Sequence, residues 1–284
     1  AGATSLPELA VDVSAVRAGL DDVAVGDLLG SSLCNLLILA IVDLLQRRRG
    51  TLINRVSEAH ALAGGLAMLL TAIVALMLML RPELSAAGVG VGTAVTAVAY
   101  SLGIRMVFHD QRVLREAAAV APSRYERAAL LRAVGLFGIA ALAVFSAAPF
   151  AAAAAGDIAE ASGLGGSFIG TTLVAASTSL PELVATIAAV RMGSRDLAVG
   201  NIFGSNVFNM AMLVVVDAFS EGPLLSRASP SHAITAIWVV IVTSVAVMGT
   251  LYRVDRRRSL IEPDAIAVIL LVVAALITVY AQAV

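Results

Sequence analysis

Long, nearly uninterrupted apolar runs constrain the fold of this chain more than any other feature. A helix of about 20 apolar residues is long enough to cross a bilayer. By that measure the sequence predicts eight spans, near residues 22–46, 58–80, 86–108, 129–153, 158–190, 196–218, 231–251 and 263–283. Charged residues make up only 14% of the chain, against about a quarter in soluble domains. The sequence therefore predicts an all-α polytopic membrane protein.

The first residues have the character of a membrane helix that is already under way. Residues 1–16 are largely apolar, and no charged segment with a small-residue cleavage site precedes them, as a cleavable signal would require. We therefore expect a further helix upstream that this chain does not include.

The arginines predict how the spans are oriented. Sixteen of them fall in or beside the loops near residues 47–55, 105–132, 191–195 and 253–258, and only Arg17, Arg81 and Arg227 fall in the loops between. Because cytoplasmic loops are enriched in basic residues, we expect a multi-pass protein of the cell (inner) membrane with a cytoplasmic connector at 109–128. The net charge of −1 provides no basic field for nucleic acid.

An internal repeat organises the chain. The sequence Thr-Ser-Leu-Pro-Glu-Leu at residues 4–9 recurs at 178–183, and with the same shift half of positions 4–43 are identical to their partners. An odd number of predicted spans separates the copies, so they run in opposite directions, as in transporters with a midplane site. We predict a first repeat at 1–108, the connector at 109–128 and a second repeat at 129–284. The alternative is a duplication retained for packing alone.

Each copy places a carboxylate, Glu8 or Glu182, inside an apolar helix. A charge at membrane depth costs at least about 2.5–3.5 kcal/mol on insertion scales, which marks it as a candidate functional group. Pro7 and Pro181 open the preceding helical turn because proline lacks the N–H that would bond back along the helix. The alternative is a structural carboxylate satisfied by neighbouring hydroxyls, beside a packing kink.

The helix that follows each glutamate carries further oxygen donors. Ser31 and Asn35 are four residues apart, as are Ser205 and Asn209, so each pair shares one helix face. Glycines spaced by four, at 26, 30, 200 and 204, predict close helix packing. A donor set made only of oxygen suits hard cations such as Ca²⁺. The histidines fall near span ends and Cys34 stands alone, which disfavours zinc, copper and iron.

These paired motifs resemble those of the calcium/cation antiporter superfamily, sodium/calcium exchanger type, in its compact prokaryotic form. The resemblance implies a bundle of about ten transmembrane helices with two inverted α-repeats. The sixth helix would be 129–153, and the first would be absent from this chain. It also implies a metal-binding set: the central carboxylates Glu8 and Glu182; the broken-helix ligands Thr4, Ser5, Thr178 and Ser179; the carbonyl donors Ala1 and Ala175; and Ser31, Asn35, Ser205 and Asn209 of the second helices.

The first repeat departs from the second at three positions. Ser32 corresponds to Asn206, Asp27 to Asn201 and Asp12 to Thr186. Asp12 and Asp27 predict an extra cation or proton site, although for Asp12 we favour a solvated position near the outer interface. Asp43 and Asp217 end their helices near the membrane boundary, where a structural role is expected.

The predicted function is secondary active exchange of Ca²⁺ for Na⁺ or H⁺ by alternating access, with small inorganic cations and the lipid bilayer as partners. An alternative is proton- or potassium-coupled exchange of another divalent cation. A channel is disfavoured because broken helices in inverted repeats point to alternating access. A pump or other ATP-dependent role would need a Gly-rich phosphate loop with its Lys, and an intramembrane protease a Ser–His pair or a zinc motif. We expect no enzyme activity and no cofactor; the oligomeric state stays open.

Overall fold

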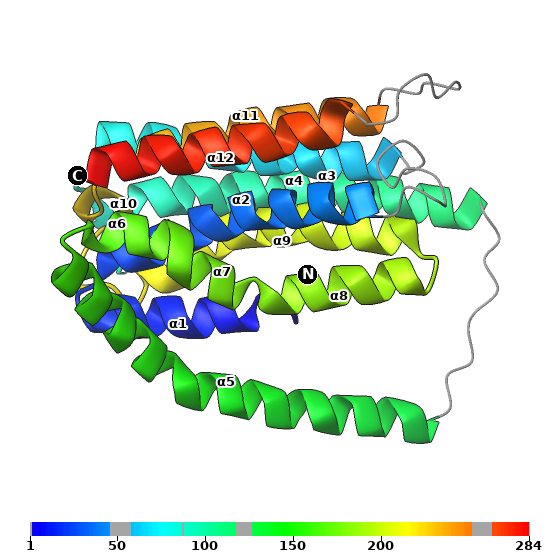
Figure 1. The fold of residues 1–284 in the computed structure, drawn as a ribbon, viewed down its shortest axis with the longest axis horizontal. Helices are drawn as coiled ribbons and strands as arrows, with labels where there is room; N and C mark the ends of the chain where they lie inside the picture. Colours follow the sequence, from blue (N-terminus) through cyan, green and yellow to red (C-terminus); the bar gives the residue numbers. More distant parts are fainter. Residues whose placement is uncertain (1, 46–57, 87, 118–126, 252–262, 284) are drawn as a thin grey trace.

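The apolar runs form a bundle of long helices laid side by side (Figure 1). The computed structural model describes residues 2–45, 58–86, 88–117, 127–251 and 263–283. Within these ranges seven helices are long and apolar enough to cross a membrane, and a bent pair gives an eighth span. The seven are α2 (Asp21–Leu45), α3 (Glu58–Leu80), α4 (Val91–Ala117), α5 (Arg127–Ser162), α9 (Arg195–Asp217), α11 (His232–Leu251) and α12 (Pro263–Ala283). The predicted all-α membrane fold with its eight spans is confirmed.

Four predicted boundaries were wrong, and one of them is the end of α4, which continues to Ala117 instead of ending near 108. Helix α5 continues to Ser162 instead of ending near 153, and the next span begins at Gly165 instead of 158. Between them Gly163 and Gly165 adopt φ values of 70° and 73°, a left-handed conformation that glycine adopts without steric cost. A short antiparallel hairpin, β1 (Ser85–Ala86) and β2 (Val89–Gly90), takes up the predicted start of the 86–108 span, so α4 begins only at Val91.

The eighth span is interrupted at the repeated motif. It comprises α6 (Gly165–Ile169), the π-helical turn η2 (Gly170–Val174) and α7 (Ala175–Thr178), and then bends by 42° into α8 (Leu180–Arg191). Helix α1 (Leu6–Arg17) begins at the corresponding point of the first repeat, after Ser5. Both helices start at a Leu-Pro pair, because a first-turn proline has no N–H to leave unpaired. The predicted break is confirmed at Pro181, whereas at Pro7 the described residues show only that a helix begins beside the proline.

The two copies of the motif run in opposite directions. In Figure 1, α1 and α8 begin near the middle of the bundle and run toward opposite ends, while α2 and α9 lie antiparallel. The turns that follow α1 and α8 each contain a left-handed glycine, Gly19 with φ 75° and Gly193 with φ 77°. The fold is therefore an inverted-repeat bundle, as predicted; the exact residue limits of the two repeats stay a prediction.

Helix α2 is the central element, and two of its glycines allow a neighbouring backbone to touch it. A β-carbon on Gly30 would overlap the Thr171 backbone of η2, and one on Gly26 would lie 3.0 Å from the Ser167 carbonyl oxygen. The glycine spacing that predicted close packing is thus explained by η2 and α6 lying against α2. This contact holds the broken span against α2, the helix that carries Ser31 and Asn35.

We expect Gly30→Ala to destabilise the protein, because overpacking a tight contact typically costs about 1–3 kcal/mol. The measurement is thermal unfolding of the purified protein in detergent. The matched control is Gly65→Ala on α3, where an added β-carbon meets nothing within 4 Å. Equal melting temperatures for the two variants would contradict the close contact between α2 and η2.

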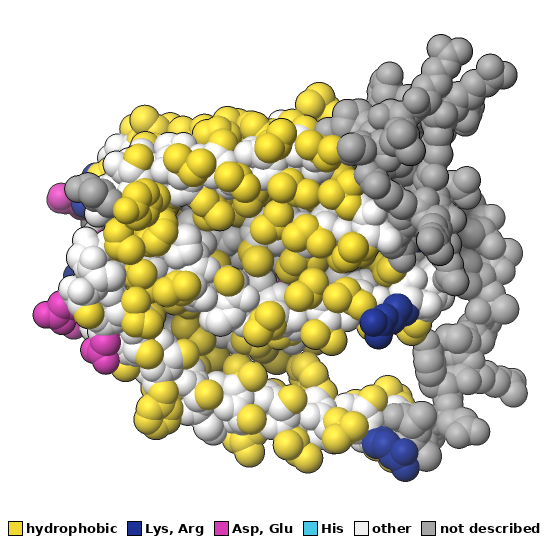
Figure 2. Space-filling view, in the orientation of Figure 1, with side chains coloured by type: hydrophobic (Ala, Val, Ile, Leu, Met, Phe, Trp, Pro, Cys, Tyr) yellow, Lys and Arg dark blue, Asp and Glu magenta, His cyan; other side chains and the backbone are white. Residues whose placement is uncertain are grey.

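The surface of the bundle is that of a protein surrounded by lipid. Figure 2 shows hydrophobic side chains over the middle of this face and charged side chains at its two ends, with the acidic ones at one end only. Large apolar side chains such as Leu142 and Phe150 on α5 are 70% and 78% exposed. An apolar belt of this kind, flanked by charged ends, fits a bilayer.

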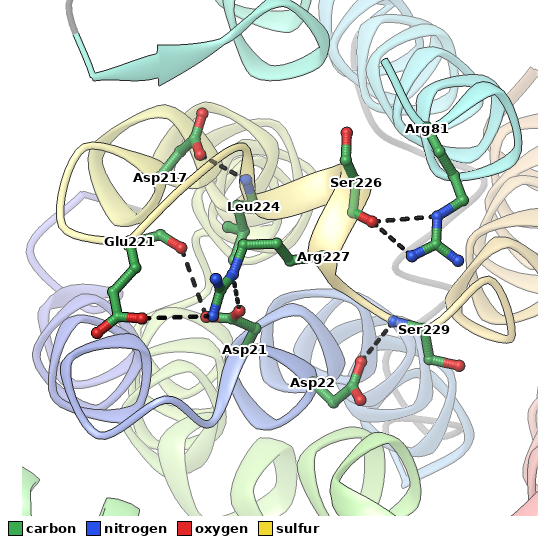
Figure 3. Close-up of polar contacts among 10 residues, drawn as sticks. Asp21, Asp22, Arg81, Asp217, Glu221, Leu224, Ser226, Arg227 and Ser229 are labelled. Carbon is green, nitrogen blue, oxygen red and sulfur yellow. Dashed lines mark hydrogen bonds and ion pairs between the residues drawn. The ribbon is translucent and has the colours of Figure 1, made fainter. Parts of the chain in front are cut away.

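Polar contacts tie the loops together at the end of the bundle where α2 begins (Figure 3). The Arg227 Nε donates to Asp21 Oδ2 at 2.6 Å, and the Ser229 backbone N–H donates to Asp22 Oδ1 at 2.6 Å. The hydrogen bond to Asp21 raises the pKa of the Arg227 guanidinium above its usual value. Because Arg227 is 39% exposed, this ion pair contributes little to stability but fixes the position of the short helix α10 (Leu224–Arg227).

Asp217, at the end of α9, has the structural role expected of it. Its carboxylate accepts hydrogen bonds from the backbone N–H groups of Leu224 and Gly90, each at 2.7 Å, and from the Thr93 hydroxyl. The side chain is fully buried. It therefore joins α9, α10 and the β-hairpin.

We expect Asp217→Ala to lower the free energy of unfolding by about 2–4 kcal/mol, because it leaves two buried N–H groups without an acceptor. Melting temperature and the fraction of monodisperse protein after extraction report the loss. Glu221→Ala, on a nearby side chain that is 82% exposed, is the control and should be neutral. An Asp217→Ala protein as stable as this control would refute the assigned role.

Candidate functional site

Four carboxyl groups meet inside the bundle near the points where α1 and α8 begin. Glu8, Asp12, Asp27 and Glu182 each have 0% of their surface exposed. Glu8 interacts electrostatically with Glu182 and Asp27, and Asp12 with Asp27 and Glu8. No arginine or histidine among the described residues forms an ion pair with any of them. Buried carboxylates so close together need bound protons or cations to balance their charge.

The hydroxyls of the first repeat reach the glutamate of the second. Ser5 Oγ donates to Glu182 Oε1 at 3.1 Å, and the Thr4 side chain bonds to the same glutamate. From α9, Ser205 Oγ donates to Glu182 Oε1 at 3.4 Å. The predicted ligands of both repeats therefore come together around one carboxylate, whose Oε2 has no partner among the described residues.

Glu8 is in a different position, although the sequence pairs it with Glu182. Neither of its carboxyl oxygens has a hydrogen-bond partner within the described ranges. Ser179, the counterpart of Ser5, likewise leaves its Oγ unpaired. Because buried polar groups are nearly always hydrogen-bonded, this cluster of unpaired oxygens marks a place where a cation can supply the missing interactions.

Asp27 accepts hydrogen bonds from two hydroxyls that were predicted to be cation ligands. Thr178 Oγ1 donates to Asp27 Oδ1 at 2.8 Å and Ser31 Oγ donates to it at 3.2 Å. Asp27 thus links α2 to the broken span, whereas the equivalent position of the second repeat is an asparagine, Asn201. Sequence reasoning had flagged Asp27 for its charge but had not predicted this contact.

Asp12 is buried against Asp27, so the expectation that it would be solvated was wrong. Its carboxyl group interacts with that of Asp27, and neither of its oxygens finds a donor in the described part of the chain. The equivalent pair in the second repeat is uncharged: Asn201 Nδ2 donates to Thr186 Oγ1 at 3.5 Å. The same geometry therefore holds two acids in one repeat and an amide with a hydroxyl in the other.

The remaining predicted ligands are placed as follows. Asn35 and Asn209 are fully buried on α2 and α9, and Asn35 bonds to Asn206, a residue absent from the predicted set. The Ala175 carbonyl accepts the Ser179 N–H at 3.0 Å within the broken span. Ala1 lies outside the described residues. The signal that could have identified Asn206 is the comparison of Gly-Ser-Ser at 30–32 with Gly-Ser-Asn at 204–206, because the two copies differ at this position.

The donors that meet in the site limit the kinds of cation that it can bind. Within the described ranges no three His, Cys, Asp or Glu side chains converge with the geometry of a metal site. Any bound cation must therefore take amide, hydroxyl or carbonyl oxygens as well, a ligand set typical of Ca²⁺ and Na⁺ and not of zinc. Inverted repeats with oxygen-lined helix breaks at mid-depth define the class of inverted-repeat secondary transporters.

Comparison with known proteins gives the particular family. Residues 1–105 and 132–282 match the sodium/calcium exchanger protein family, and the chain belongs to it. It is 33% identical over 222 residues to the inner membrane protein YrbG of Escherichia coli, covering 76% of this chain and 65% of YrbG. It is 50% identical over 56 residues to the sodium/calcium exchanger MaX1 of Methanosarcina acetivorans, 20% of this chain and 16% of MaX1. The chain thus spans less than two thirds of the length of these curated relatives.

A solved structure agrees with the fold. The sodium-calcium exchanger NCX_Mj, soaked with Na⁺ and Sr²⁺, superposes with a TM-score of 0.62 at 20% identity, covering 96% of this chain and 82% of that one. At this level of identity the likeness demonstrates a shared all-helical membrane fold.

Proposed function

We propose that this chain exchanges Ca²⁺ for Na⁺ across the membrane by alternating access. The observation that carries the proposal is the buried cluster of carboxyl, hydroxyl and amide groups that lies where the oppositely directed helices α1 and α8 begin. The names of relatives such as the sodium/calcium exchanger MaX1 support the choice of ions. No chemical step on a substrate is required, because exchange needs only a site that can face either side in turn.

In this proposal Glu8 and Glu182 are the central Ca²⁺ ligands. Ca²⁺ takes six to eight oxygens, and two carboxylates neutralise its charge. The unpaired oxygens of Glu8, Glu182 and Asn35 provide part of that shell. Hydroxyls and carbonyls from the two breaks complete it: Thr4, Ser5, Ala175, Thr178, Ser179, Ser31 and Ser205, with Asn209 from the second helix. When Ca²⁺ leaves, Na⁺ ions or protons balance the same carboxylates.

The Asp12–Asp27 pair is proposed as the place where the counter-ion acts. Two buried acids in contact hold either a proton or a monovalent cation between them. Sodium is the first candidate, and proton or potassium coupling, with another divalent cation in place of Ca²⁺, is the alternative. The end of the bundle where α4 ends and α5 begins is proposed to face the cytoplasm.

The test is ⁴⁵Ca²⁺ uptake into proteoliposomes that contain the full-length protein. An outward Na⁺ gradient and, separately, a pH gradient drive uptake. Uptake with Na⁺ alone supports a sodium/calcium exchanger, and uptake with the pH gradient alone supports a proton/calcium antiporter. Failure of both gradients to drive uptake, with correctly inserted protein, would refute calcium exchange.

A further inference from the structure

A hydrogen-bonded chain across the α2–α9 contact fixes the orientation of one candidate ligand. Asn35 Nδ2 donates to Asn206 Oδ1 at 3.0 Å, and Asn206 Nδ2 donates to the Ser32 carbonyl oxygen at 3.1 Å. Asn35, Asn206 and Ser32 are all at most 1% exposed. The backbone carbonyl can only accept, so it sets which end of the Asn206 amide carries the N–H₂ group, and Asn206 in turn sets the orientation of Asn35.

The consequence for Asn35 is that its oxygen stays available. Its Nδ2 is used in the contact with Asn206, whereas its Oδ1 is buried and has no partner among the described residues. Because this amide oxygen is already held in one orientation, binding a cation does not cost the entropy of ordering it. Its N–H₂ end, which would repel a cation, is turned away.

The equivalent arrangement is missing from the other repeat. The shift of 174 that pairs Asn35 with Asn209 pairs Asn206 with Ser32. Ser32 Oγ donates at 3.0 Å to the Leu28 carbonyl of its own helix and offers nothing to Asn209. Asn209 is fully buried, yet both its Nδ2 and its Oδ1 lack a partner in the described part of the chain.

We propose that Asn206 is a positioning residue that turns the Asn35 oxygen toward the transported cation, and that Ser32 leaves Asn209 without the same support. The inference rests on the proposed function, because it assumes that Asn35 and Asn209 face a bound cation. The two repeats then contribute unequally: Asn35 is pre-oriented, and Asn209 must be ordered by the cation itself.

The test is equilibrium binding of ⁴⁵Ca²⁺ to the purified full-length protein, so that it does not depend on transport. Asn206→Ser removes the support of Asn35 and should weaken Ca²⁺ binding by about tenfold, as loss of a residue that orients a metal ligand typically does. Asn201→Ser makes the same change on the same helix, outside the proposed ligand set, and should leave binding within about twofold. Size-exclusion profiles and melting temperatures establish that each variant is folded.

A swap of the two residues separates positioning from packing. In Ser32→Asn/Asn206→Ser the support moves to the other repeat and should orient Asn209, restoring affinity to within about threefold of wild type. Ser32→Asn alone should orient both amides and tighten binding by several-fold.

Wild-type affinity in Asn206→Ser, or a double variant no better than Asn206→Ser, would overturn the inference. If Asn206→Ser does not fold, Ser32→Asn decides, and unchanged affinity in that variant counts against it. A wild-type protein that binds no Ca²⁺ would overturn the proposed function itself, and this inference with it.

Discussion

Glu182→Ala is expected to abolish calcium exchange while leaving insertion and folding intact. Glu182 is the carboxylate on which Ser5 and Ser205 converge, and removing it leaves a divalent cation with half of its central charge balance. One unit charge about 4 Å away is worth about 4 kcal/mol at an effective dielectric constant of 20. That is more than a hundredfold in binding, so the ⁴⁵Ca²⁺ uptake rate should fall at least about a hundredfold.

Glu160→Ala, an exposed acid on α5, serves as the control and should transport normally. Glu182→Gln separates charge from shape, because the amide retains an acceptor for both hydroxyls but carries no charge. Ca²⁺ transport at the wild-type rate by Glu182→Ala would show that the site has been placed wrongly.

Asp27→Asn is expected to change how exchange depends on the counter-ion. The amide oxygen can still accept from Thr178 and Ser31, so the contact between α2 and the broken span survives. What is lost is one negative charge beside Asp12. We expect uptake to fall about tenfold or more. The Hill slope for the driving ion should also fall by about one, because one of the two buried carboxylates whose charge that ion balances has been removed.

Initial rates across a series of Na⁺ concentrations or pH values measure that slope. The matched variant is Asp27→Asn/Asn201→Asp, which moves the acid to the equivalent position of the other repeat and keeps the total charge. An unchanged slope in Asp27→Asn would exclude Asp27 from counter-ion binding.

Much of the fold could be predicted because membrane helices depend on local composition. The apolar runs located the eight spans, and the repeated Leu-Pro pairs located the starts of α1 and α8. The end of α5 and the start of α6 were misplaced because the turn between them depends on two left-handed glycines, Gly163 and Gly165, which follow an alanine-rich sequence that continues the helix.

The site was only partly predictable, because its contacts cross between the repeats. The sequence identified Glu8 and Glu182, but not that Ser5 bonds to Glu182 while Ser179 leaves Glu8 unpaired. Asp12 was misjudged because its distance along α1 gives its depth but not that α2 covers it with Asp27. These features depend on how α1, α2 and α9 cross, which no local pattern specifies.

The antiparallel arrangement of α1 with α8 also bears on the resting state of the protein. If the two repeats were identical, the inward-open and outward-open forms would be related by a two-fold rotation about an axis in the membrane plane, so they would have equal free energy and equal populations. Only the substitutions between the repeats can break this degeneracy, and the buried ones at 12, 27 and 32 lie where the repeats meet. A net difference of about 1.4 kcal/mol would hold ten molecules facing one side for each one facing the other. The preferred resting side is thus encoded in the positions at which the halves of the chain disagree, including the three that are buried where the repeats meet.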